Sequence, residues 1–74
     1  MFQDEALTVL SHHQITPQQL LTKLCMIPTR TVELPDQQNR VWTFVCRQSC
    51  GLYLMAKTAS MQQFEELYHT RCRY

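Results

Sequence analysis

Four cysteines and three histidines are the residues of this chain best suited to hold a metal ion or to attack a substrate. Cys46 and Cys50 are separated by three residues across a predicted turn, and His69 and Cys72 are separated by two. Thiolate and imidazole groups at such spacings serve as ligands of tetrahedral zinc. These four positions therefore form a candidate zinc site. A zinc knuckle usually has a two-residue gap around a tight turn with glycine, which the segment from Cys46 to Cys50 does not reproduce.

Simpler interpretations compete with zinc. Cysteine thiols are often small buried hydrophobic groups, and Cys25 and Cys46 fit that role. His12 and His13 form a pair that could bind a metal or respond to pH near neutrality. They also fall in the last turn of a predicted helix, where histidine interacts well with the exposed carbonyl groups.

The same residues do not predict an enzyme. On a helix, Glu65, His69 and Cys72 would share one surface, as an orienting carboxylate, a base and a nucleophile must. A single exposed helix, however, provides neither a pocket nor an oxyanion hole. The chain has one glycine, Gly51, which excludes a phosphate-binding loop. We therefore expect a non-enzymatic protein with no cofactor.

The composition predicts a single small domain over residues 1–74. Hydrophobic residues make up 45% of the chain, charged residues 18%, and the net charge is +1. A chain this short buries only about 60% of the surface that its unfolded form exposes, so its core is thin. Self-association is one common way for such a domain to gain stability. We therefore expect a homodimer.

The sequence also favours a cytoplasmic protein. Asp4 and Glu5 occupy the segment where a signal peptide carries basic residues, and no apolar run approaches the ~20 residues that span a bilayer. In a reducing compartment all four cysteines would be thiols. The glutamine- and threonine-rich composition suits a bacterial, phage or plasmid protein.

Two short helices are predicted in the N-terminal half. The apolar residues between positions 3 and 13 recur at helical spacing. A second helix begins at Pro17, because Thr16 and Gln19 form a capping box and proline suits the first helical position. Pro28 ends this helix, since the residue before a proline is disfavoured in helical conformation.

Three strands and a last helix follow. Residues 31–34, 41–47 and 52–57 alternate or are rich in β-branched and aromatic side chains, and short connections predict an antiparallel meander. Ser60 and Gln63 form a second capping-box pattern, and Phe64, Leu67 and Tyr68 recur at helical spacing. The predicted fold is therefore α+β, with two N-terminal helices, a three-stranded antiparallel meander and a C-terminal helix packed on the sheet.

Neither face of this predicted sheet is cleanly polar. A sheet with one buried face alternates more sharply than this. Either helices cover both faces, or one face meets a partner protein. Aromatic residues and methionine are enriched at protein interfaces. The candidate partner-binding residues are Trp42, Tyr53, Met55 and Tyr74.

Nucleic-acid binding is the main alternative. A three-stranded sheet followed by a helix resembles, in outline, the small modules that read a DNA groove with a sheet, such as the N-terminal modules of tyrosine integrases. The near-neutral charge gives little general attraction to phosphates. The basic residues that would contact DNA are Arg40, Arg47, Lys57, Arg71 and Arg73.

The sequence thus predicts a small accessory or regulatory protein that acts through protein–protein contact and forms a homodimer. A DNA-binding regulator that uses the hairpin is the first alternative. A zinc-stabilised interaction module is the second.

Overall fold

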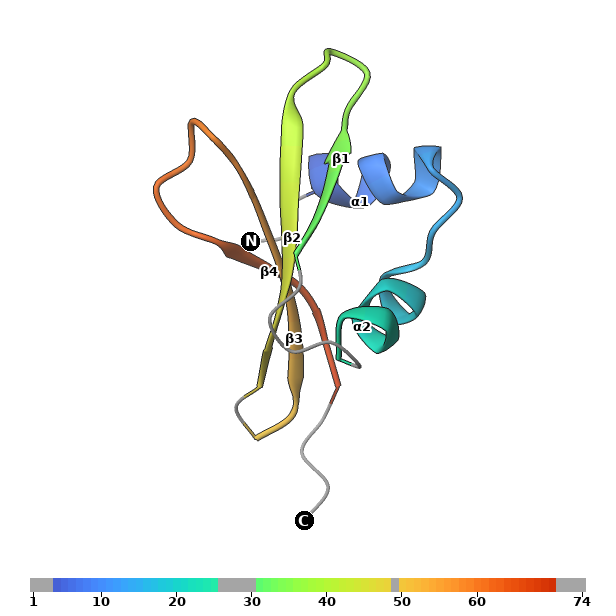
Figure 1. The fold of residues 1–74 in the computed structure, drawn as a ribbon, viewed down its shortest axis with the longest axis vertical. Helices are drawn as coiled ribbons and strands as arrows, with labels where there is room; N and C mark the ends of the chain where they lie inside the picture. Colours follow the sequence, from blue (N-terminus) through green and yellow to red (C-terminus); the bar gives the residue numbers. More distant parts are fainter. Residues whose placement is uncertain (1–3, 26–30, 49, 71–74) are drawn as a thin grey trace.

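The computed structural model describes residues 4–25, 31–48 and 50–70, which form two helices and a four-stranded antiparallel sheet (Figure 1). The strands follow one another in the order β1-β2-β3-β4. None of the helices in these ranges has the length and apolar character needed to cross a membrane. The elements are α1 (Asp4–His12), α2 (Pro17–Cys25), β1 (Val32–Pro35), β2 (Val41–Gln48), β3 (Leu52–Thr58) and β4 (Glu65–His69).

Helix α1 ends in a Schellman motif. The N–H of Ile15 donates to the carbonyl of Leu10 over 2.9 Å, and the N–H of Gln14 donates to that of Ser11 over 3.0 Å. Gln14 adopts a left-handed conformation with φ of 60°, which reverses the chain after the helix. This turn lets α2 follow after a short connection.

The capping box predicted for α2 is confirmed. The Thr16 hydroxyl accepts from the N–H of Gln19 over 3.1 Å, and the Gln19 side chain accepts from the N–H of Thr16 over 3.1 Å. Two N–H groups that helical bonds leave unpaired are satisfied in this way. Pro17 is the first residue of the helix, as predicted.

The three predicted strands are also confirmed. β2 pairs with β3 so that Trp42 lies opposite Thr58 and Phe44 opposite Ala56, while β1 places Leu34 opposite Trp42. Paired residues share a face of the sheet, and successive residues alternate between faces. The side chains of Leu34, Trp42 and Phe44 therefore lie on one face with those of Ala56 and Thr58.

The predicted C-terminal helix is wrong. Residues 65–69 form β4, a fourth strand that pairs antiparallel with β3, and residues 61–64 belong to the connection before it. The capping box predicted at Ser60 and Gln63 is not formed; instead the Ser60 hydroxyl hydrogen-bonds that of Thr58 over 3.0 Å. The outline likeness to DNA-binding modules with a helix after the sheet is lost with this helix.

A β-bulge explains why β4 looked helical in sequence. Leu54 pairs with Tyr68, but Met55 pairs with Glu66, so Leu67 is an extra residue in β4. Leu67 is buried and Tyr68 packs against the same core, although they are consecutive. The bulge thus breaks the two-residue alternation. With Phe64 three residues earlier, the pattern imitates a helical stripe.

The core lies between the helices and one face of the sheet. Leu20, Leu21 and Leu24 of α2 pack there, and Trp42 and Phe44 are its largest fully buried side chains. Figure 1 shows both helices on the same side of the sheet. The other residues of the buried hydrophobic core are Ala6, Val9, Leu10, Leu54, Ala56 and Leu67.

Candidate functional site

The candidate site is the sheet face opposite the helices, which we call the open face because no described helix covers it (Figure 1). Trp42, Phe44 and Leu54 are buried and identify the face that packs on the helices. The residues that alternate with them, and their partners in the neighbouring strands, belong to the open face. The open face comprises Glu33, Val41, Thr43, Val45, Arg47, Tyr53, Met55, Lys57, Glu66 and His69, together with Phe64 of the β3–β4 connection.

The centre of the open face is apolar. Val45 and Met55 are half-buried partners in the β2–β3 ladder. The two large hydrophobic side chains that stand out as exposed in the described chain, Val41 at 49% and Phe64 at 36%, both belong to this face. A hollow of about 490 Å³ is lined by Val45, Met55 and Phe64, together with Cys46, Arg47 and Gln63. Exposed apolar area beside a hollow is a feature of interaction sites.

Charged and aromatic groups surround this centre. The Lys57 ammonium lies 5.6 Å from the centre of the Phe64 ring, within cation–π range. Glu66 pairs with His69 over 2.7 Å, and the His69 ring stacks on Tyr53 with centroids 5.3 Å apart. Arg47 is exposed at the end of β2. The open face therefore combines apolar contact area with both signs of charge.

The two edges of the sheet are less suited to binding than this face. β1 ends in Pro35, which has no N–H to offer to another strand, and β4 carries Glu65, Glu66 and the bulge at Leu67. Proline, charge and bulges are the devices by which natural sheets discourage edge-to-edge pairing. The open face therefore offers a better contact surface than either edge.

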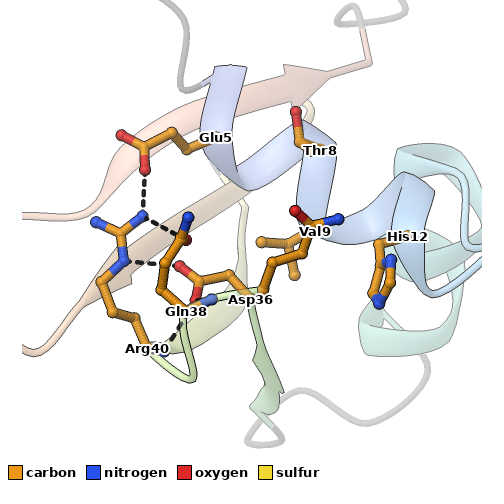
Figure 2. Close-up of a pocket in the computed structure, with 8 residues that line it drawn as sticks. Glu5, Thr8, Val9, His12, Asp36, Gln38 and Arg40 are labelled. Atoms are coloured by element: carbon orange, nitrogen blue, oxygen red, sulfur yellow. Dashed lines mark hydrogen bonds and ion pairs between the residues drawn. The ribbon is translucent and has the colours of Figure 1, made fainter.

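A second polar cluster lies between α1 and the β1–β2 hairpin, around a small pocket of about 160 Å³ (Figure 2). Asp36 accepts from the Arg40 guanidinium over 2.7 Å and from the indole of Trp42 over 3.1 Å. Arg40 also pairs with Glu5, which reaches it from α1. These bonds hold the hairpin to the helix, so the pocket is part of the scaffold.

The carboxylate of Asp36 is the electrostatic centre of this cluster. Burial alone raises its pKa, but hydrogen bonds from Trp42, the N–H groups of Arg40 and Gln38 and the Arg40 guanidinium outweigh that effect. The pKa of Asp36 is therefore lowered from 3.8 to about 2. Hydrogen bonding to Glu5 and Asp36 in turn raises the pKa of Arg40.

The candidate zinc ligands do not converge in the described chain. Cys46 pairs with Leu54 on the helix side, whereas His69 pairs with Tyr53 on the open face. Opposite faces of a sheet cannot supply ligands to one ion at about 2 Å. The fourth candidate, Cys72, lies outside the described residues. More broadly, the described residues contain no group of three or more possible metal ligands.

The described cysteines also differ from the expectation that all four are thiols. Cys46 is a half-buried thiol at the edge of the core. Cys50, in the β2–β3 turn, is disulfide-bonded. It adopts a left-handed conformation with φ of 49°, next to Gly51 with φ of 131°.

The candidate partner-binding residues are divided by the fold. Tyr53 and Met55 lie on the open face, half-buried. Trp42 lies in the core with 2% exposure, so its ring is not available to a partner. Tyr74 is outside the described residues. Val45 and Phe64, which complete the apolar centre, were not singled out from sequence; Val45 could have been found from its alternation with Trp42 and Phe44.

The candidate nucleic-acid residues are divided too. Arg47 and Lys57 are on the open face, whereas Arg40 is engaged by Asp36 and Glu5. Arg71 and Arg73 lie outside the described residues. Comparison of the chain with protein-family models, curated proteins and solved structures finds no match.

Proposed function

We propose that this protein is a non-enzymatic accessory or regulatory factor that acts by binding another protein chain through the open face. The observation that carries the proposal is the placement of both helices on one side of a four-stranded sheet whose other side has an apolar centre. Antiparallel sheets with one solvated face normally present polar side chains there. Val45, Met55 and Phe64 break that pattern.

The composition of the face suits a protein partner. Tyrosine, phenylalanine, methionine and arginine are the types enriched in protein interfaces, and Tyr53, Phe64, Met55 and Arg47 represent each of them. Apolar anchors surrounded by polar groups form the usual anatomy of such a surface. We propose that Met55, Val45 and Phe64 are the anchors.

Nucleic acid is the second candidate partner, because Arg47 and Lys57 lie on the same face as the aromatic rings of Tyr53 and Phe64. Bases stack on such rings, and phosphates pair with such cations. Two features favour protein instead. Glu33 and Glu66 lie on the same face, and Arg40 is held by two carboxylates.

The test is affinity capture of the tagged protein from the cell that produces it, with and without nuclease and at low and high salt. Met55→Lys places a charge at the centre of the open face, and Ser11→Lys is the control on exposed α1. We expect capture of a protein partner to persist after nuclease treatment and in about 1 M salt. The amount captured should fall more than about tenfold with Met55→Lys and stay unchanged with Ser11→Lys. Capture that disappears with nuclease or salt supports nucleic acid. Equal capture by both variants rules out the open face.

A further inference from the structure

We propose that the disulfide of Cys50 joins the β2–β3 turn to Cys72, and that this bond is a reversible link which holds the C-terminal end of β4 in place. Cys50 is disulfide-bonded, whereas Cys46 is a thiol. The chain has four cysteines, so within one copy the partner of Cys50 is either Cys25 or Cys72. The inference does not depend on what binds the open face.

The pairing of β3 with β4 is the argument for Cys72. Tyr53 pairs with His69, and one step closer to the turn the N–H of Thr70 donates to the carbonyl of Leu52 over 2.9 Å. The N–H of Leu52 in turn donates to the Thr70 hydroxyl over 3.1 Å. In an antiparallel pair, each step along one strand is matched by a step in the opposite direction along the other. Two further steps therefore bring position 72 opposite position 50.

The spacing of this register suits a disulfide. Opposed Cα atoms of antiparallel strands lie about 4.5–5.5 Å apart, and Cα atoms joined by a disulfide usually lie about 4.4–6.8 Å apart. The competing candidate, Cys25, is the last residue of α2. Figure 1 shows α2 beside the middle of the sheet and the β2–β3 turn at the lower end of the sheet, clear of the helix. The fold therefore favours Cys72.

The position of Cys50 makes the bond accessible to a reductant. Cys50 is exposed in the turn, and exposed disulfides are the labile ones. A dithiol reductant transfers two electrons and two protons to the bond. The S–S bond breaks, Cys50 and Cys72 become thiols, and the dithiol becomes a disulfide. The core residue Trp42 lies at the other end of β2, so this step leaves its packing intact.

Reduction should loosen the end of β4 that carries His69. β4 is an edge strand of five residues that pairs with β3 and is interrupted by the bulge at Leu67. Short pairing at an edge opens locally more readily than the interior of a sheet. The His69 ring stacks on Tyr53 with centroids 5.3 Å apart, so the link also holds this stack in place. The redox state of Cys50 thus sets how firmly the end of β4 is held.

Tryptic digestion without reduction tests the connectivity, because the cleavage sites of trypsin separate all four cysteines. The peptides that carry Cys25, Cys46, Cys50 and Cys72 are, in that order, 24–30, 41–47, 48–57 and 72–73. Iodoacetamide is present throughout to capture thiols before they exchange with disulfides. Mass spectrometry should find 48–57 joined to 72–73. A peptide 48–57 that is joined to 24–30, joined to a second copy of itself or labelled by iodoacetamide would overturn the proposal.

NMR of ¹⁵N-labelled protein before and after reduction with dithiothreitol tests the reversible role. The amide signals of Leu52 and Thr70 should shift on reduction and return on reoxidation, while the indole signal of Trp42 stays in place. Cys72→Ser should give the reduced positions of these amide signals without any reductant, and Cys25→Ser should behave as the wild type in both states. Reduction that unfolds the chain would show a structural bond and overturn the reversible link. Unchanged signals of Leu52 and Thr70 would overturn it as well.

Discussion

The indole Nε1 of Trp42 donates a hydrogen bond to Oδ2 of Asp36 across 3.1 Å. The bond joins the largest side chain of the core to the first residue after β1. The other oxygen of Asp36 accepts from the N–H groups of Gln38 and Arg40 over 2.8 Å and 2.9 Å, and so closes the hairpin loop. One carboxylate thus organises the loop, the core and the ion pair that reaches α1.

Loss of the Asp36 charge should lower stability in a pH-dependent way. Its pKa is lowered in the folded chain from 3.8 to about 2. A carboxylate with a lowered folded pKa contributes stability above its unfolded pKa, and that contribution is lost as pH falls. We expect Asp36→Asn to melt below the wild type at pH 7. The difference should narrow between about pH 4 and pH 2, as circular dichroism melts would report.

Glu33→Gln is the control for this prediction, because it removes an exposed carboxylate from the neighbouring strand. It should melt close to the wild type at pH 7. A melting difference for Asp36→Asn that stays constant from pH 7 to pH 2 would contradict the role given to the carboxylate.

The capping box of α2 should be worth a measurable part of the folding free energy. Thr16→Ala removes the hydroxyl that accepts from Gln19, and loss of an N-cap typically costs about 1 kcal/mol. Thr22→Ala is a matched change in the same helix. The Thr22 hydroxyl only bonds the carbonyl of Gln18, and alanine is the better helix former. Urea unfolding should therefore show a loss for Thr16→Ala and no loss for Thr22→Ala.

Substitution of two phenylalanines should distinguish the core from the open face. Phe44 is fully buried and Phe64 is 36% exposed. Phe44→Ala should cost about 3–5 kcal/mol, enough to unfold much of so small a domain. Phe64→Ala should keep a cooperative melt but weaken binding at the open face. Equal destabilisation by the two changes would show that Phe64 belongs to the core.

The state of the described cysteines can be read by alkylation. Iodoacetamide applied to the unfolded, unreduced protein should label Cys46, a thiol, and leave Cys50 unlabelled, because a disulfide sulfur is not a nucleophile. Peptide mapping after reduction with a second label distinguishes the two sites. Labelling of Cys50 in the first step would contradict the disulfide and agree with the thiols expected from sequence.

The sequence correctly predicted those structural features that depend on residues close together in the chain. The capping box at Thr16 and Gln19, the proline at position 17 and the β-branched run of β2 each depend on neighbours within a few residues. The last element could not be read in this way, because the bulge at Leu67 is defined by pairing with β3. Without that partner, Phe64, Leu67 and Tyr68 have the spacing of a helix.

The candidate site was predictable in part for a similar reason. Alternation places Tyr53 and Met55 on one face, and both lie on the open face. Which face the helices cover depends on tertiary packing, so the same alternation left Trp42 as either anchor or core. Arg40 looked like a free cation because one partner, Glu5, is 35 residues away in sequence, and the other, Asp36, meets it only in the folded hairpin loop.

The burial of Trp42 also provides the protein with an internal optical probe. It is the one tryptophan in the chain, and its ring lies in the core against the Asp36 carboxylate, on the side away from the open face. Its emission therefore reports loss of the fold and protonation of Asp36, but not occupancy of the opposite face. A surface variant that loses its partner with unchanged tryptophan fluorescence has lost binding and kept its structure.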